Sequence, residues 1–145
     1  MSLLVKQLMS KQVQSISIDA TLDSALKALN MNSIHRLPVV DKNLNLVGII
    51  TDRDLRLACD SPFLDETNQE RMEKLKNHTV QSIMKHNPIT IEDNSLVVDA
   101  CKLMRVSNVG GLPVTNREGK LCGIITRSDL LDLVIRLLEP VPPQN

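Results

Sequence analysis

Leu37–Leu55 reads LPVVDKNLNLVGIITDRDL, and it recurs as Leu112–Leu130, LPVTNREGKLCGIITRSDL. The second copy lies 75 positions after the first, and 10 of the 19 residues are identical. The shared letters are Leu-Pro-Val, Leu, Gly-Ile-Ile-Thr and Asp-Leu, which predict a pair of buried strands and then the first turn of a helix. The same offset relates three apolar residues near the N-terminus to a second set: Val5, Leu8 and Met9 to Val80, Ile83 and Met84. The chain is therefore predicted to be one structural unit built twice.

Two copies are too few for a solenoid, which needs about three repeats to be stable. We expect an α/β fold in which the two repeats pack as a pseudo-twofold pair, with ligand clefts between their equivalent edges. Each half has about 60 residues, a size at which a lone domain is marginal, so the halves are expected to share a core. The predicted boundaries are repeat 1 over 1–60, a linker over 61–79, repeat 2 over 80–139 and a frayed tail over 140–145.

The composition excludes several classes of function. The 17 basic residues balance the 17 acidic ones, and the chain has one Phe and no Trp or Tyr. It therefore lacks both the positive charge and the aromatic platforms that are typical of nucleic-acid binding. Cys59, Cys101 and Cys122 have no CxxC spacing, so we expect buried apolar fillers in a reducing compartment. With no leader and no run of about 18 apolar residues, the chain is expected to be cytoplasmic, without a membrane partner.

Each repeat is predicted to have the order β-α-β-β-α. Apolar residues recur at helical spacing over 22–29 and 97–104, and Thr21 and Ser95 are the expected N-caps. Alternating residues over 13–18 and a shorter segment over 88–91 predict the leading strands. Apolar runs split by turn residues predict the hairpins, and a closing helix begins at Thr51 or Thr126. Within the linker, the capping box Thr67-x-x-Glu70 predicts a helix over 68–77.

The residues best suited to chemistry are the tetrapeptides Thr51-Asp52-Arg53-Asp54 and Thr126-Arg127-Ser128-Asp129. One interpretation is structural, because Thr-x-x-Asp before an apolar helix is a capping box. The other is functional, because a strand that runs into a helix presents unpaired backbone N–H groups and a positive dipole end, which suit phosphate. Thr and Asp side chains can also bond a ribose, and Gly48 and Gly123 would let a ligand or a neighbouring backbone approach closely. On the residues alone both interpretations stay open.

The order LPVVD and then LVGIIT-x-x-D-L, present twice, resembles the tandem cystathionine-β-synthase (CBS) domain pair, or Bateman module. The resemblance covers about Leu4–Leu138. It implies an adenosine-containing ligand, such as AMP, ADP, ATP, S-adenosylmethionine or NAD(H), bound between the repeats. It also implies that Asp54 and Asp129 hold ribose hydroxyls and that Thr51 and Thr126 face phosphate or ribose. The backbone around four apolar residues would line the purine pocket: Ile16, Ile89, Pro38 and Pro113.

Ile34–Val39 (IHRLPV) is similar to the repeats of the γ subunit of AMP-activated protein kinase, where the His-Arg pair faces nucleotide phosphates. The resemblance implies that His35 and Arg36 contact phosphate; the alternative is a solvated approach to a strand. The second repeat has Gly110-Gly111 there, so we expect two unequal sites, of which the one receiving His35 and Arg36 prefers phosphorylated ligands. Two further cations at the helix starts are candidates for the same role: Arg53 and Arg127.

No catalytic constellation can be recognised, because the sequence has no nucleophile elbow, metal-ligand spacing or GxxxxGK phosphate loop. We therefore expect no enzyme, metal or catalytic cofactor, but a stand-alone regulatory protein that binds an adenine nucleotide and signals its occupancy to an unknown protein partner. The alternative is a ligand-free scaffold for dimerisation or protein docking. Apolar residues on more than one face of the last helix predict a homodimer: Leu130, Leu131, Leu133, Val134, Leu137 and Leu138.

Overall fold

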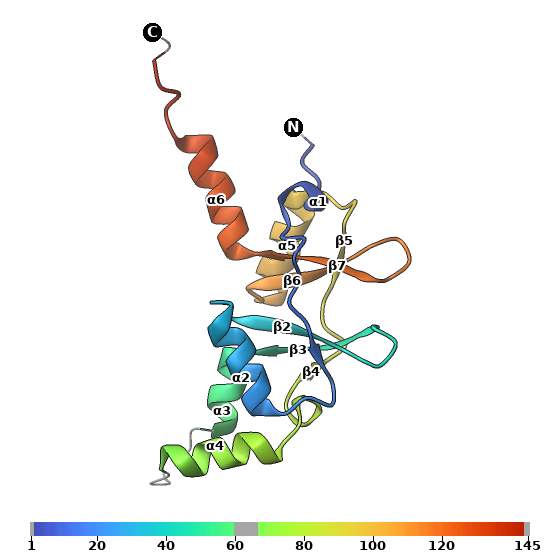
Figure 1. Cartoon of the computed structure of the whole chain (residues 1–145). Coiled ribbons are helices and arrows are strands. Elements are labelled where there is room, and N and C mark those ends of the chain that lie inside the picture. The colour runs from blue at the N-terminus through green and yellow to red at the C-terminus, as the bar shows by residue number, and fades with distance from the viewer. Residues whose placement is uncertain (1, 60–66, 144–145) are drawn as a thin grey trace. The chain divides into compact units, whose positions relative to one another are not determined.

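The computed structural model of the protein describes residues 2–59 and 67–143. The chain forms two compact units: unit 1 combines Met1–Val13 with Thr90–Asn145, and unit 2 is Gln14–Ile89 (Figure 1). Each unit joins a small sheet to helices, which confirms the predicted α/β class. Unit 1 takes its first residues from one end of the sequence and the rest from the other.

Unit 2 is built on a four-stranded sheet in the order β1-β2-β3-β4. Strand β1 pairs with β2 in parallel, and the other two pairings are antiparallel. The predicted hairpin is present as β2–β3, with Leu37 opposite Ile50. The elements in chain order are β1 (Ile16–Ser17), α2 (Leu22–Met31), β2 (Arg36–Val40), β3 (Leu46–Thr51), α3 (Asp52–Cys59), α4 (Asn68–Asn77), the 3-10 helix η1 (Val80–Ser82) and β4 (Lys85–His86).

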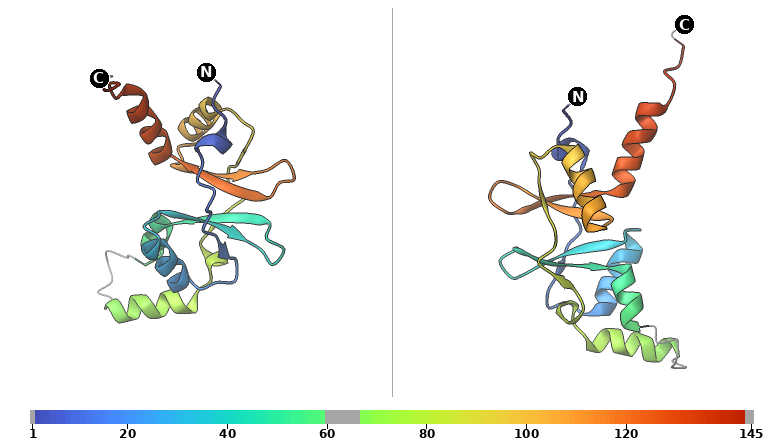
Figure 2. Two further views of the ribbon diagram at one scale, coloured as in Figure 1. Left: turned by 45° about the horizontal axis from the view of Figure 1, so that its top comes forward. Right: turned by 180° about the vertical axis from the view of Figure 1, so that it is seen from behind.

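The core of unit 2 lies between one face of the hairpin and the helices. Alternation along β2 turns Leu37 and Val39 into this core, and neither is exposed. Helix α2 contributes Leu22, Ala25 and Leu29, which confirms the helical spacing read from the sequence. Figures 1 and 2 show α4 running across the ends of α2 and α3, which it contacts.

Helix α4 confirms the helix predicted for the linker. The Thr67 hydroxyl accepts the Glu70 N–H at 3.2 Å, and the Glu70 carboxylate accepts the Thr67 N–H at 2.8 Å. The capping box satisfies two of the N–H groups that a helix start leaves unpaired. Leu75, only 3% exposed, ties α4 to the core of unit 2.

Unit 1 repeats this plan on a three-stranded sheet in the order β5-β6-β7. Leu112, Val114 and Ile125 form the centre of its core, and none is exposed. Its last helix, α6, has no buried residue and extends away from β7 (Figure 2). The elements are α1 (Val5–Leu8), β5 (Ile91–Glu92), α5 (Val97–Ser107), β6 (Gly111–Thr115), β7 (Leu121–Thr126) and α6 (Arg127–Leu138).

The segment that leads into each repeat packs in the unit formed mainly by the other repeat. In unit 1 the Val5 N–H donates to the Ser95 carbonyl at 2.9 Å, and in unit 2 the Val80 N–H donates to the Ala20 carbonyl at 2.7 Å. Val5 and Val80 are both fully buried. The structure describes one cluster of buried apolar residues in each unit, and each cluster contains residues of both predicted repeats.

Gly48 and Gly123 lie where these leading segments cross the hairpins. A Cβ on Gly48 would lie 2.9 Å from the Lys85 carbonyl oxygen, and a Cβ on Gly123 would lie 3.0 Å from that of Ser10. Such contacts are too short for a side chain to be accommodated without a shift of the backbone. Of the two roles expected for these glycines, the structure provides the close approach of a neighbouring backbone.

The structure corrects three local expectations. The N-cap of α5 is Leu96 and not Ser95, because the first backbone bond of the helix ends on the Leu96 carbonyl, whereas the Ser95 carbonyl accepts the Val5 N–H from outside the helix. The leading strand β1 covers only Ile16–Ser17 of the alternating segment. Cys101 is exposed and Cys59 and Cys122 are only partly buried, so none of the three is the fully buried filler that we expected.

Two predicted segments lie partly outside the described residues. Residues 61–66 of the linker and 144–145 of the tail are not described, and 140–143 have no regular secondary structure. The repeat boundaries themselves stay a prediction. Among the helices that the structure describes, none has the length and apolar character needed to cross a membrane.

Candidate functional site

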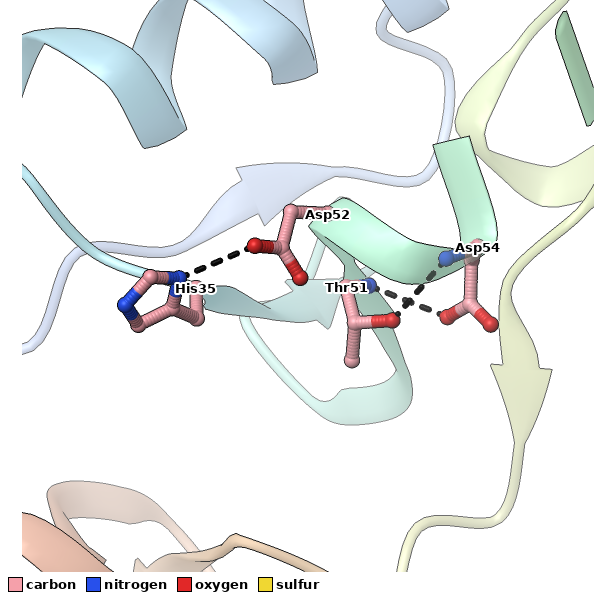
Figure 3. A network of polar contacts seen from close by, with 4 residues as sticks. All are labelled: His35, Thr51, Asp52 and Asp54. Atoms are coloured by element: carbon pink, nitrogen blue, oxygen red, sulfur yellow. Dashed lines mark hydrogen bonds and ion pairs between the residues drawn. The ribbon is translucent and has the colours of Figure 1, made fainter. Parts of the chain in front are cut away.

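In unit 2 the candidate site is built where β3 runs directly into α3. Thr51 is the last residue of β3, and a reciprocal pair of bonds links it to the first turn of the helix. The Asp54 N–H donates to the Thr51 hydroxyl at 3.1 Å, and the Thr51 N–H donates to Asp54 Oδ2 at 3.0 Å (Figure 3). The structural interpretation of Thr-x-x-Asp as a capping box is thus confirmed here.

Thr126 and Asp129 form the same box at the start of α6. The Thr126 N–H donates to Asp129 Oδ2 at 2.7 Å, and the Asp129 N–H lies 3.4 Å from the Thr126 hydroxyl oxygen. Here the Thr126 hydroxyl also donates to Asp129 Oδ2, at 3.1 Å. Its proton is therefore committed, whereas the Thr51 hydroxyl has no acceptor among the described residues.

Both capping boxes leave one hydrogen-bond acceptor available for a ligand. Each carboxylate uses Oδ2 for the cap, and within residues 2–59 and 67–143 its Oδ1 accepts no hydrogen bond. Asp54 and Asp129 are only half-buried, so Oδ1 can accept a hydroxyl from outside the chain. A carboxylate fixed by its own helix is a preorganised acceptor, because little side-chain freedom remains to be lost on binding.

His35 and Arg36 lie beside this box. Arg36 opens β2 directly opposite Thr51, and His35 precedes it. His35 Nδ1 lies 2.9 Å from Asp52 Oδ2, and Figure 3 shows Asp52 turned toward His35 while Asp54 lies on the other side of Thr51. A second bond, from the Asp52 N–H to the His35 carbonyl at 2.9 Å, ties the two residues through the backbone.

Asp52 is ionised near neutral pH. Partial burial is the largest single effect and raises the pKa of its carboxyl, but hydrogen bonds from His35 and from the Arg53 N–H, together with nearby positive charge, bring that pKa below its ordinary value. The positive charge of Arg56 acts in the same direction. The side chains of His35 and Asp52 are 74% and 40% exposed, so the pair lies at the surface and contributes little to stability.

The equivalent place in unit 1 has the same backbone and different side chains. Gly111 lies opposite Thr126, and the Arg127 N–H donates to the Gly110 carbonyl at 3.0 Å. Gly110 and Gly111 occupy the positions equivalent to His35 and Arg36, and Arg127 occupies the position equivalent to Asp52. The two candidate sites are therefore unequal in charge and in donors.

The remaining predicted residues are divided between the units. Unit 2 contains Ile16, half-buried on β1, and Ile89, which is 42% exposed beyond β4. Pro38 and Pro113 are almost fully buried, on β2 and β6. Unit 2 thus holds most of the predicted set, and unit 1 holds four of its members: Pro113, Thr126, Arg127 and Asp129.

Asp52 stands in the first tetrapeptide, but the sequence analysis assigned no role to its side chain. Its contact with His35 joins positions 17 apart in the sequence, so no local sequence pattern predicts it. One signal was present, since the repeat offset aligns Asp52 with Arg127, a reversal of charge between the retained Thr and Asp of the motif.

The architecture of the two units corresponds to a known family. The model of the CBS domain matches residues 5–61 and, a second time, residues 80–136. The chain belongs to the CBS domain family. Its two matches in tandem make it a CBS pair, as the resemblance of its motifs implied.

Relatives of this CBS pair include a CBS domain-containing protein of Dictyostelium discoideum. The two are 69% identical over 145 residues, which cover 100% of each chain. Two further curated relatives, from Methanocaldococcus jannaschii and Arabidopsis thaliana, are longer, and the chain spans about half of their length.

Two solved structures share the fold. CBSX2 of Arabidopsis thaliana, crystallised in complex with AMP, has a TM-score of 0.79 and 28% identity, covering 94% of this chain and 99% of that one. The CBS domain pair of protein MJ0100, in complex with 5′-methylthioadenosine and S-adenosyl-L-methionine, has a TM-score of 0.75 and 29% identity, with coverage of 92% and 97%.

Proposed function

We propose that this CBS pair is a regulatory protein that binds an adenosine-containing ligand at its Thr-x-x-Asp boxes. The observation that carries the proposal is the pair of preorganised carboxylates, each with a free Oδ1 beside a helix start. Similar CBS pairs have been crystallised with AMP and with S-adenosyl-L-methionine, which supports adenosine as the shared chemical group. No catalytic step is part of the proposal.

In the proposed complex the ribose hydroxyls donate to Oδ1 of Asp54 or Asp129. A 5′-phosphate then lies toward the helix start and, in unit 2, toward His35, Arg36 and Arg53. In unit 1 only Arg127 offers a side-chain cation at the equivalent place. We propose that the adenine lies against the backbone around four apolar residues: Ile16, Pro38, Ile89 and Pro113.

The phosphate end should decide affinity, because the chain has no Trp or Tyr and a single Phe to stack on adenine. We expect AMP to bind at least about tenfold more tightly than adenosine, the scale of one charge-assisted bond. Replacing Arg36 by Ala should remove most of that difference.

A thermal-unfolding panel tests the proposal. The full chain is heated alone and with AMP, ADP, ATP, NADH, S-adenosylmethionine, adenosine and, as a matched control without adenine, cytidine monophosphate. A ligand at about 100 times its dissociation constant adds about 2.7 kcal/mol of stability, which is a clear shift. If no adenosine compound shifts the transition more than cytidine monophosphate does, the proposal is wrong.

A second candidate, a dimerisation or docking scaffold, is favoured by α6. Leu131, Ile135 and Leu138 on this helix are 63%, 53% and 77% exposed, an apolar surface that a second copy would cover. We propose that the protein is a homodimer in either case and that a protein partner responds to its occupancy. Light scattering should give twice 16.1 kDa at micromolar concentration, and Leu131→Glu with Leu138→Glu should return the monomer. A wild-type monomer would refute this.

A further inference from the structure

Asp52 and His35 form a pair whose protons can be assigned by chemistry. Asp52 carries a carboxylate, and a carboxylate only accepts hydrogen bonds. The proton in the contact between His35 Nδ1 and Asp52 Oδ2, at 2.9 Å, must therefore be on the imidazole. In a neutral ring with its proton on Nδ1, the other nitrogen, Nε2, carries only a lone pair.

A lone pair at Nε2 has the wrong polarity for phosphate. Figure 3 shows Nε2 on the side of the ring turned away from Asp52, and the side chain is largely exposed. A phosphate oxygen can accept a bond from Nε2 only after that nitrogen takes up a proton. The ring is then a cation with both N–H groups engaged, Nδ1 with Asp52 and Nε2 with phosphate.

We infer that Asp52 is a positioning residue that fixes the tautomer of His35, so that recognition of a phosphorylated ligand in unit 2 takes up one proton. The inference rests on the proposed function and adds a dependence on pH to it. Adenosine, which carries no phosphate, binds without this uptake. The charged groups beside the pair are Arg36 on β2, Arg53 and Arg56 on α3, and Arg71 of α4, which lines one pocket with Asp52 and Arg56.

The coupling is confined to unit 2. In unit 1 the place of His35 is taken by Gly110 and that of Asp52 by Arg127, which is positively charged at all working pH values. One chain would thus carry a proton-coupled site and a site that is indifferent to pH in the same range. The difference in affinity between a phosphorylated ligand and its unphosphorylated form would depend on pH in unit 2 and not in unit 1.

Proton counting tests the inference on the full chain. Calorimetric titration with AMP and with adenosine, in two buffers of different ionisation enthalpy, gives the protons taken up per ligand. At about pH 7.5–8 a free imidazole is mostly neutral and the AMP phosphate is mostly a dianion. The wild type should take up close to one more proton with AMP than with adenosine. Its AMP affinity should therefore fall by up to about tenfold for each unit by which the pH is raised.

Two variants assign that proton. His35→Gln keeps a donor that does not titrate, so it should bind AMP with no extra uptake. Asp52→Asn keeps the shape, but its amide can donate to a bare Nδ1; the ring can then hold its proton on Nε2, and uptake should fall to about half or less. Glu73→Gln, on the exposed face of α4, removes one negative charge elsewhere and should leave the proton count unchanged.

Equal proton uptake with AMP and adenosine in the wild type would overturn the inference. So would an Asp52→Asn variant that keeps the full difference, because Asp52 would then not set the tautomer. Failure of both ligands to bind is a separate result, which would overturn the proposed function and this inference with it.

Discussion

Asp54 and Asp129 each serve the fold and, by our proposal, the ligand. Oδ2 of each carboxylate caps a helix and Oδ1 accepts no bond within the described residues, so one substitution affects two measurable quantities. We predict that Asp54→Ala or Asp129→Ala weakens nucleotide binding by about 1.5–3 kcal/mol, the range for hydrogen bonds to a charged group. Loss of the cap should separately lower stability by about 1 kcal/mol. Titration calorimetry measures the first effect and urea unfolding the second; wild-type affinity in both variants would refute the ribose assignment.

Asp52 gives a prediction for stability at acid pH. Its folded pKa lies below the ordinary value of 3.8, so its contribution is present above that value and is lost as the pH falls through the folded pKa. We predict that Asp52→Asn lowers the free energy of unfolding by roughly 0.5 kcal/mol at neutral pH, as for a surface pair. The difference from wild type should shrink once the pH falls below 3.8 and should vanish as the pH passes through the lowered folded pKa of Asp52. Urea midpoints across this range check it, and a constant difference would contradict it.

Local bonding explains which site residues the sequence revealed. The capping boxes at Thr51 and Thr126 were predicted because both members of each box lie within four residues. The partner of His35 was not predicted, because which residue a histidine before a strand meets depends on where the next helix begins. Whether Thr51 and Thr126 face a ligand depends on tertiary placement, so that role stays a prediction.

The two hairpin turns form a matched pair of elements. Asp41 and Asn116 each accept two backbone N–H groups through Oδ1, and the fourth residue of each turn has a positive φ. That residue is Gly119 in unit 1, with φ 78°, and Leu44 in unit 2, with φ 62°. A left-handed backbone costs a residue with a Cβ about 1–2 kcal/mol, so unit 2 carries a strain that unit 1 avoids.

This strain can be removed or introduced by exchange. We predict that Leu44→Gly raises the free energy of unfolding by about 0.5–1 kcal/mol, the relief less the extra entropy of a glycine in the unfolded chain. Gly119→Ala should lower it by about 1 kcal/mol, and no neighbour lies within 4 Å of the added Cβ to cause a clash. Urea unfolding of both variants checks the pair of signs; a less stable Leu44→Gly would show that its exposed side chain matters more than its backbone.

The elements themselves were largely predictable, for a reason visible in α2 and α4. Helix α2 has apolar residues at helical spacing, and α4 has a capping box at its start, and both signals are contained in single segments. The length of the first strand was overestimated, because the alternating pattern continues beyond the two residues that pair with β2. Pairing is a property of two segments, and one segment cannot reveal it.

The exchange of leading segments organises the whole molecule. Val5 packs with the core around Leu112 and Ile125, although it lies at the start of the first repeat, and Val80 packs with the core of unit 2. The offset of 75 positions showed that these residues are equivalent. It could not show which repeat each one joins, because both assignments keep the same local pattern.

We predict that Val5→Ala destabilises unit 1 first, by about 2 kcal/mol, from lost burial and the cavity left behind. Hydrogen exchange should then accelerate at residues 91–126 before it does so at residues 16–51. Val80→Ala is the matched control and should reverse the order. Equal acceleration in both units by either variant would contradict independent cores.

The discontinuity of unit 1 sets an order of events during synthesis of the chain. Unit 2 is a single stretch of sequence, which is complete once Ile89 has left the ribosome. In unit 1 the bond from Lys6 to Asn94 can form only after a further 88 residues have followed Lys6. Domains fold as units when their residues are available, so residues 5–9, which are made before unit 2, find their place only after it. The nascent chain would carry an unsatisfied Val5–Met9 segment past a finished unit 2, and this segment is where a chaperone would act.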